Sequence, residues 1–170
     1  LALLVDAAHA RDLQLEAWVN PYRIQAGQTP ALCGASPARL HPDWVRYTDT
    51  GAYLDPANAD VRQYIADVVG ELCARYAVDG IHFDDAFDPT TDPAFDAADY
   101  AASGSTRTQD DWRRENVNAL TALCHAAARR YGVRFGAAPA GDPELNYTLQ
   151  YSDAARWLRQ GTVDYLMPPL

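Results

Sequence analysis

The chain has 170 residues, of which 48% are hydrophobic and 22% are charged, and its formal net charge at pH 7 is -9. A chain of this length supports one domain with a hydrophobic core. The acidic balance argues against nucleic acid and anionic membranes as partners, because both are bound through basic surfaces. No apolar run is long enough to span a membrane. The composition is compatible with neutral ligands such as sugars.

The first third of the chain predicts a helix, a strand and a long loop. Apolar residues at helical spacing predict a helix over residues 1–11, and the apolar run 13–19 predicts a strand that ends at Asn20-Pro21. Residues 24–55 contain glycine or proline at many positions and are predicted to form a loop. Loops of this length in compact domains usually have a function.

The rest of the chain alternates between helices and strands. Helices are predicted from residues 55–58 to Tyr76, over 109–131 and over 152–160, the last with Ser152 as its N-cap. Strands are predicted over 80–83, 133–138 and 163–167, and a second loop covers 86–107.

This alternation predicts an α/β fold with parallel strands and right-handed helical crossovers. Four strands are half of the number in a closed (β/α)8 TIM barrel. We therefore expect residues 1–170 to be an internal fragment of one barrel domain, with about four parallel βα units and truncation at both ends. Unpaired sheet edges should make the isolated segment prone to aggregation. An open doubly wound sheet is the alternative, although no glycine-rich phosphate loop follows any strand.

The sequence predicts no metal ion and no cofactor. Its cysteines form no CxxC pair, and its histidines form no HxH or HExxH pair. The acids of the second loop do not have the spacing of a calcium-binding loop and are expected to be solvated, with Arg113 or Arg114 neutralising part of their charge. These acids are Asp88, Asp92, Asp96 and Asp99.

The most informative segment is the strand that ends in two adjacent carboxylates, Asp84 and Asp85. Parallel barrels build their active sites at the carboxyl ends of strands. Because strand side chains alternate between faces, Ile81 and Phe83 should face the helices, while His82 and Asp84 point into the barrel. Two carboxylates in one site push their pKa values apart, which provides a general acid and an ionised partner. The structural alternative is that Asp84 pairs with an arginine and Asp85 caps the loop.

Polar residues also follow the preceding strand. Asn20, Tyr22 and Arg23 lie just beyond its end, where they would bind sugar hydroxyls or orient Asp84. The alternative for Asn20 is ordinary turn chemistry.

Two tryptophans have different expected roles. Trp18 belongs to the first strand and is expected to lie in the core rather than to form a stacking platform for a sugar. Trp44 ends the segment HPDW in the first long loop, where it either stacks on a sugar ring or pins the loop to the domain. The sequence leaves both roles of Trp44 open.

Several segments resemble the bacterial glycosyl-hydrolase-like family 10 domain, in the family's order and along nearly the whole chain. They are AWVNPYR at 17–23, HPDW at 41–44, YLDP at 53–56, VDGIHFDD at 78–85, DWRRENVN at 111–118 and VDY at 163–165. The resemblance implies a TIM-barrel protein that is secreted or periplasmic and similar to glycosidases that cut peptidoglycan glycan strands. It also implies that Asp84 and Asp85 belong to the active centre.

The chain departs from the family pattern after the paired acids. The family has aromatic residues there, as in DDYFYP, whereas this chain reads DDAFDP, so Ala86 and Asp88 replace two tyrosines. The family's PQLYW ending is reduced to Pro168-Pro169-Leu170. These losses bear on substrate specificity more than on the fold. A distant likeness to chitinase-type barrels is rejected, because Ala86 occupies the position of their essential glutamate.

We therefore expect a glycoside hydrolase whose partner is a bacterial cell-wall or related amino-sugar polysaccharide, cleaved through Asp84 and Asp85. The alternative is a glycan-binding barrel without catalysis, which the missing tyrosines favour. The expected substrate contacts are Asn20, Tyr22, Arg23, Trp44, His82 and Tyr165.

Overall fold

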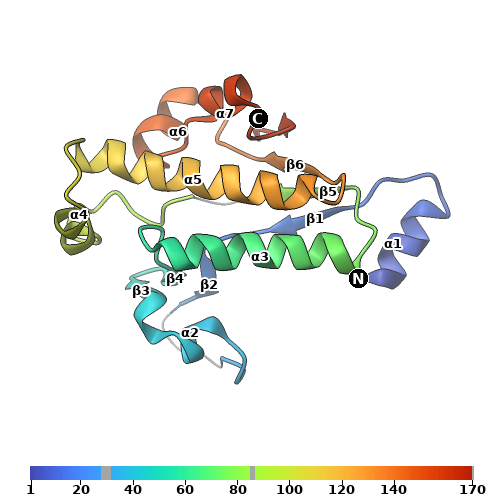
Figure 1. Ribbon diagram of the computed structural model, residues 1–170, viewed down its shortest axis with the longest axis horizontal. Coiled ribbons are helices and arrows are strands. Elements are labelled where there is room, and N and C mark those ends of the chain that lie inside the picture. The colour runs from blue at the N-terminus through green and yellow to red at the C-terminus, as the bar shows by residue number, and fades with distance from the viewer. Residues whose placement is uncertain (28–31, 85–86, 170) are drawn as a thin grey trace.

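The computed structural model describes residues 1–27, 32–84 and 87–169. Its centre is a four-stranded parallel sheet in which the strands follow one another in chain order (Figure 1). The strands are β1 (Glu16–Val19), β5 (Gly80–Phe83), β6 (Arg134–Ala137) and β7 (Tyr165–Leu166). Within the described part of the chain, β1 and β7 each pair with one neighbour, so the sheet is an open arc.

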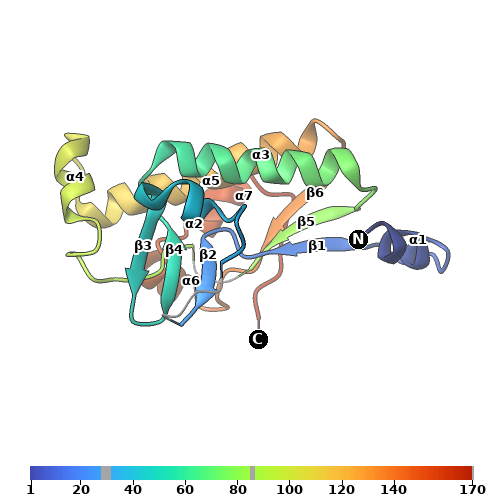
Figure 2. The same cartoon turned by 90° about the horizontal axis from the view of Figure 1, so that it is seen from below.

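Two long helices cover one face of this sheet. Figure 2 shows α3 (Ala59–Arg75) and α5 (Gln109–Arg129) side by side on the same face of β1, β5 and β6. A doubly wound sheet would carry helices on both faces and would reverse its strand order. Sequential parallel strands with helices on one face confirm the predicted partial (β/α)8 barrel instead.

The core lies between the helices and the sheet. Residues of β5 and β6 that face the helices are fully buried, and Phe83 packs edge-on against Phe135 with ring centroids 4.8 Å apart. Asn58 starts α3 by accepting the Asp60 N–H, and Thr108 starts α5 by accepting the Asp111 N–H. The helix α7 (Ala154–Gln160) buries Trp157 completely against the same core.

The predicted loop over 24–55 is wrong, because this segment contains a second sheet. The strands β2 (Arg23–Ala26), β4 (Gly51–Leu54) and β3 (Val45–Thr48) pair antiparallel in that order, with short helices α2 (Pro37–Leu40) and η1 (Pro42–Trp44) in the connection. Each strand has only four residues, which is too short for alternation to stand out against turn residues. Gly51 is required, since a Cβ there would lie 2.2 Å from the Gln25 carbonyl oxygen.

Three smaller differences concern helices. The first helix, α1, covers Ala2–His9, and two further short helices, α4 (Ala97–Ser103) and α6 (Pro143–Leu149), lie where the sequence predicts none. The N-cap of α7 is Asp153 rather than Ser152, because the Asp153 carboxylate accepts the N–H of Arg156 at 2.9 Å. Among the described residues, none of the helices is long and apolar enough to cross a membrane.

Candidate functional site

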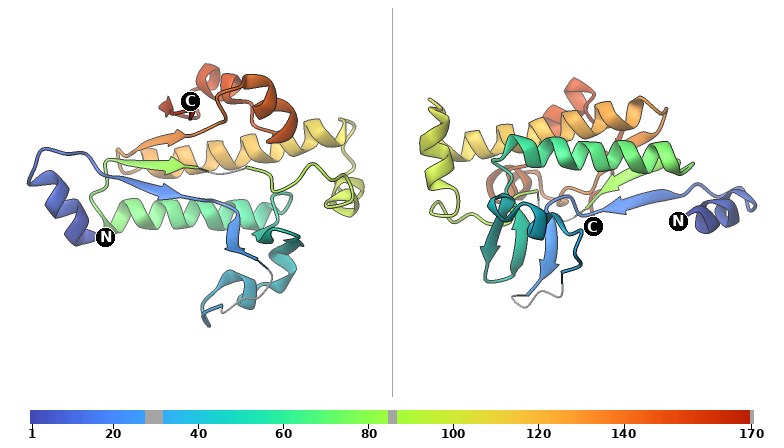
Figure 3. Two further views of the ribbon diagram at one scale, coloured as in Figure 1. Left: turned by 180° about the vertical axis from the view of Figure 1, so that it is seen from behind. Right: turned by 60° about the horizontal axis from the view of Figure 1, so that its bottom comes forward.

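The face of the sheet opposite the helices carries the candidate site. Ile81 and Phe83 are fully buried against the helix layer, whereas His82 and Asp84 line a cavity on the other face. The structure agrees here with the alternation of β5. The sheet lies in front of α3 and α5 when the molecule is seen from behind, so this face is turned away from the two helices (Figure 3). The cavity has a volume of about 390 Å³ and is lined by Glu16, Trp18, His82, Asp84, Ala138, Met167, Pro168 and Pro169.

Asp84 stands at the carboxyl end of β5, where its backbone is held from the neighbouring strand. Its N–H donates to the Val19 carbonyl oxygen at 3.1 Å. With its amide oriented to satisfy both neighbours, Asn20 donates to the Asp84 carbonyl oxygen at 3.2 Å and accepts from Arg23. The segment after β1 therefore positions the backbone of the candidate acid. Asp85 lies outside the described residues.

Trp18 is 71% exposed on the inner face, so the prediction that it lies in the core is wrong. It pairs with His82 across β1 and β5, and the two rings meet edge-on with centroids 6.0 Å apart. Trp18 shares this face with Glu16, two residues earlier, because strand side chains alternate. The indole therefore forms part of the cavity wall.

Tyr22 and Trp44 lie away from the cavity at β5. Tyr22 is 1% exposed, and burial raises the pKa of its phenol well above the usual range. Trp44 stacks on His41 at 3.9 Å between ring centroids and packs against Tyr64, so it pins its loop to α3. Neither residue lines the cavity at β5. The second of the two roles left open for Trp44 is the one its contacts support.

Sequence reasoning missed Glu16, which lines the cavity with His82 and is connected to it through Tyr165. Tyr165 donates its hydroxyl proton to Glu16, and its oxygen lies 3.4 Å from His82 Nδ1. The rings of His82 and Tyr165 stack at 5.9 Å with an interplanar angle of 11°. The alternation of Glu16 with Trp18 was the signal for this position. These three side chains, Glu16, Tyr165 and His82, therefore link the strands β1, β7 and β5.

Gly136 makes room for the Tyr165 ring, because a Cβ there would lie 2.2 Å from that ring. We expect Gly136→Ala to displace the ring and to lower the free energy of unfolding by about 1–3 kcal/mol in urea titrations. Gly70 in α3 is the control, since a Cβ there meets nothing within 4 Å. Gly70→Ala should raise stability by about 0.5–1 kcal/mol. Equal unfolding midpoints for the two variants would contradict the close contact.

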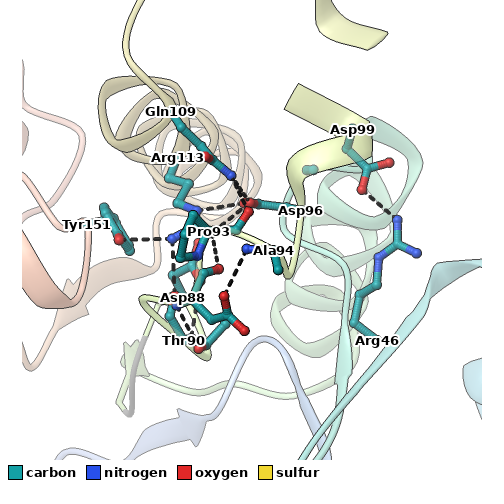
Figure 4. Close-up of polar contacts among 12 residues, drawn as sticks. Arg46, Asp88, Thr90, Pro93, Ala94, Asp96, Asp99, Gln109, Arg113 and Tyr151 are labelled. Carbon is teal, nitrogen blue, oxygen red and sulfur yellow. Dashed lines mark hydrogen bonds and ion pairs between the residues drawn. The ribbon is translucent and has the colours of Figure 1, made fainter. Parts of the chain in front are cut away.

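Arg113 of α5 holds the loop that follows β5 through hydrogen bonds to Asp92 and Asp96 (Figure 4). The Arg113 side chain is 1% exposed and donates to both oxygens of Asp96, at 2.7 Å from Nε and 2.6 Å from Nη2. It also donates to the Asp92 carbonyl oxygen at 2.7 Å and to the Tyr151 hydroxyl at 2.9 Å. Gln109 adds a hydrogen bond to Asp96 at 2.6 Å.

The expectation that the acids of this loop are solvated is wrong for two of them, Asp88 and Asp96. Asp88 is 4% and Asp96 3% exposed. Burial raises the pKa of Asp88 to about 7, against the opposing effect of Arg113. Among the described residues, no group of three or more histidine, cysteine, aspartate or glutamate side chains is arranged to hold a metal ion.

Comparisons with known proteins agree with this architecture. A profile of the family described as Glycosyl hydrolase-like 10 matches residues 1–170. Glycosyl hydrolase YngK of Bacillus subtilis (strain 168) is 34% identical over 195 residues, which cover 100% of this chain and 38% of that protein. Glycosyl hydrolase DigH of Escherichia coli (strain K12) is 32% identical over 200 residues, covering 100% of this chain and 45% of that protein. The chain thus spans less than half of the length of these curated relatives.

Solved structures of glycosidases share the fold at low sequence identity. An alpha-amylase from Malbranchea cinnamomea aligns with a TM-score of 0.56 and 17% identity, over 98% of this chain and 32% of that one. The PgaB (BpsB) glycoside hydrolase domain from Bordetella bronchiseptica aligns with a TM-score of 0.51 and 12% identity, over 92% of this chain and 51% of that one. These similarities concern the fold alone. Because the family profile matches the chain from end to end, the chain belongs to the glycosyl hydrolase-like 10 family.

Proposed function

We propose that the protein is a glycoside hydrolase and that Asp84 and Asp85 are its acidic groups. The observation that carries the proposal is the position of Asp84, which lines an open cavity at the carboxyl end of a barrel strand, on the face away from the helices. Parallel barrels place their catalytic groups at this end. Membership of a glycosyl hydrolase-like family supports the same reaction type.

The reaction needs one carboxylic acid and one carboxylate across the glycosidic bond. The acid protonates the leaving oxygen, while the carboxylate either attacks the anomeric carbon, to give an intermediate that water then hydrolyses, or takes a proton from the water that attacks that carbon directly. The Asn20 side chain would hold Asp84 in place through the hydrogen bond to the Asp84 carbonyl oxygen. Trp18 offers an exposed apolar ring to the sugar. Arg23, in contact with Asn20, extends the same support.

The proposed substrate is a bacterial cell-wall or related amino-sugar polysaccharide. This choice follows from the resemblance of the segments AWVNPYR and VDGIHFDD to the family's motifs, since the relatives' names state only that they are glycosyl hydrolases. Because such a substrate lies outside the cytoplasmic membrane, the proposal also places the protein in the periplasm or outside the cell.

A glycan-binding barrel without catalysis is the second candidate, favoured by the loss of two family tyrosines. One of them is replaced by Asp88, which is 4% exposed, is close enough to Arg113 for the guanidinium to lower its pKa, and does not line the cavity. The other replacement, Ala86, lies outside the described residues. The loss at Asp88 therefore lies behind the site, which weakens this alternative.

We expect Asp84→Asn to reduce the release of sugars from peptide-free glycan strands by about 100-fold or more, because general acid or base catalysis contributes about that factor. Binding of the strands should be retained, since asparagine keeps the size of the side chain. The measurement is product release by the intact protein, quantified by chromatography, together with a binding titration.

Asp67→Asn serves as the control, because Asp67 lies on α3 and contacts Gln63 at 2.8 Å, away from the cavity. It should leave product release unchanged. Wild-type turnover in Asp84→Asn would contradict the catalytic role of Asp84. Strand binding by the wild-type protein without any product would support the glycan-binding alternative instead.

A further inference from the structure

The hydrogen-bonded series Glu16, Tyr165 and His82 determines which of its atoms carry the protons. Tyr165 donates its hydroxyl proton to Glu16, and the Tyr165 oxygen is 3.4 Å from His82 Nδ1. A phenol has one proton to donate. Once that proton is directed to Glu16, the oxygen can only accept from His82. In the neutral imidazole, Nδ1 then carries the proton and Nε2 keeps a lone pair.

Further contacts keep Glu16 an acceptor and Tyr165 a donor in this series of hydrogen bonds. Arg134 Nη2 donates to Glu16 Oε1 at 3.2 Å, so the carboxylate remains an acceptor on both oxygens. Burial and the hydrogen bond to Glu16 raise the pKa of Tyr165, so the phenol keeps its proton. The Tyr165 ring stacks on His82 and sits against Gly136, which fixes the approach of its oxygen.

The other ring nitrogen of His82, Nε2, is left as a hydrogen-bond acceptor for a ligand in the cavity. His82 is 8% exposed and lines the cavity, and in the described part of the chain Nε2 has no hydrogen-bond partner. The other groups around this imidazole are Trp18 on β1 and Asp84, which follows the last residue of β5 and lines the same cavity. A sugar hydroxyl in the cavity would supply the missing donor.

We infer that Glu16 and Tyr165 are positioning residues that hold His82 as the Nδ1–H tautomer, so that Nε2 accepts a hydrogen bond from a sugar hydroxyl beside Asp84. The sugar in this statement rests on the proposed function. The tautomer does not, because it follows from the protein's own contacts.

The tautomer is measured on the intact, 15N-labelled protein without substrate, from long-range 1H–15N correlations of His82 at a pH where the imidazole is neutral. We expect Nδ1–H in the wild-type protein. Tyr165→Phe keeps the ring and removes the acceptor, so the Nε2–H form should become dominant. The KM for glycan strands should then rise roughly threefold to tenfold, the effect of one hydrogen bond, with a smaller change in kcat.

Glu16→Gln provides a second variant, because its amide can donate to Tyr165 and free the phenol proton for His82 Nδ1. The same shift to Nε2–H is expected. Tyr100→Phe is the control, since it removes a hydroxyl that donates to the Arg107 carbonyl oxygen at 2.6 Å, outside the cavity. It should leave the tautomer of His82 unchanged.

An Nε2–H tautomer in the wild-type protein, or an unchanged tautomer in both site variants, would overturn the inference. A shifted tautomer with an unchanged KM would overturn the contact with the sugar hydroxyl. Since the tautomer is read without substrate, its outcome is independent of the Asp84→Asn assay, and failure of one is not failure of the other.

Discussion

Replacing Arg113 with methionine is expected to destabilise the protein by about 3–5 kcal/mol, because it leaves a buried carboxylate without its cation. Arg113 is 1% exposed and donates two hydrogen bonds to Asp96, which is itself 3% exposed (Figure 4). Methionine replaces the aliphatic part of the side chain, so the loss concerns charge and hydrogen bonds more than volume. Urea unfolding followed by tryptophan fluorescence gives the free energy of unfolding.

Another ion pair of α5 provides the matched control. Arg156 of α7 donates to Glu115 of α5 at 2.5 Å, with side chains that are 31% and 32% exposed. Arg156→Met should cost no more than about 1 kcal/mol, because water screens a partly exposed pair. If Arg113→Met costs no more than Arg156→Met, the buried pair does not hold the loop. Asp96→Leu added to Arg113→Met should recover part of the loss, since it removes the unpaired charge.

The sequence predicts the parallel sheet and its helices because long periodic segments dominate them. The apolar stripe of α3 and the strand Gly80–Phe83 agree with their predicted ranges to within a few residues. The antiparallel sheet was missed because its strands have four residues each, and because a register shift between Arg23 and Gln25 interrupts the alternation of β2. Pairing with the neighbouring strands of the sheet, rather than a pattern within each strand, determines such strands.

In the candidate site, too, the residues that continue the alternation of a regular strand are predictable from the sequence, whereas those beyond that alternation are not. His82 and Asp84 were assigned to the correct face, because β5 alternates regularly and its apolar partners need the helix layer. The hydrophobicity of Trp18 predicts a core position, whereas its alternation with Glu16 puts both side chains on the exposed inner face. Tyr22 lies beyond Pro21, where the strand ends, so the alternation of β1 no longer determines which way its side chain points.

The burial of Asp88 was not accessible from the sequence. Acidic residues are mostly exposed, and four of them in one loop are normally solvated. What changes the outcome is Arg113, which α5 brings from 25 residues further along the chain to meet this loop. Tertiary contacts of this kind carry no local signature.

Replacing Asp88 with asparagine is expected to stabilise the protein at pH 8 and to leave its stability nearly unchanged at pH 4. Burial raises the pKa of this carboxyl from 3.8 to about 7, with Asp96 and Asp55 adding to the rise and Arg113 and the Thr90 N–H opposing it. Between these two values the native state binds a proton that the unfolded state has released. Stability from this group therefore falls as the pH rises from about 4 to about 7, and is constant above that.

Asparagine is neutral at every pH and can still accept the Thr90 N–H, which donates to Asp88 Oδ1 at 3.3 Å in the wild-type protein. The variant removes the cost of ionising a buried group, which amounts to at most about 4 kcal/mol above pH 7. The measurement is the free energy of unfolding of both proteins at unit steps of pH between 4 and 8. The difference should grow with pH up to about 7 and then level off.

Asp111→Asn provides a control of opposite sign. Hydrogen bonds from Arg114 and Thr108 lower the pKa of Asp111, so its carboxylate contributes stability that is present above the unfolded pKa and lost as the pH falls. Asp111→Asn should therefore be less stable than the wild-type protein at neutral pH, and the gap should narrow in acid. Parallel pH profiles for Asp88→Asn and the wild-type protein would show that Asp88 is ionised at no cost, and hence that the loop behind β5 admits water.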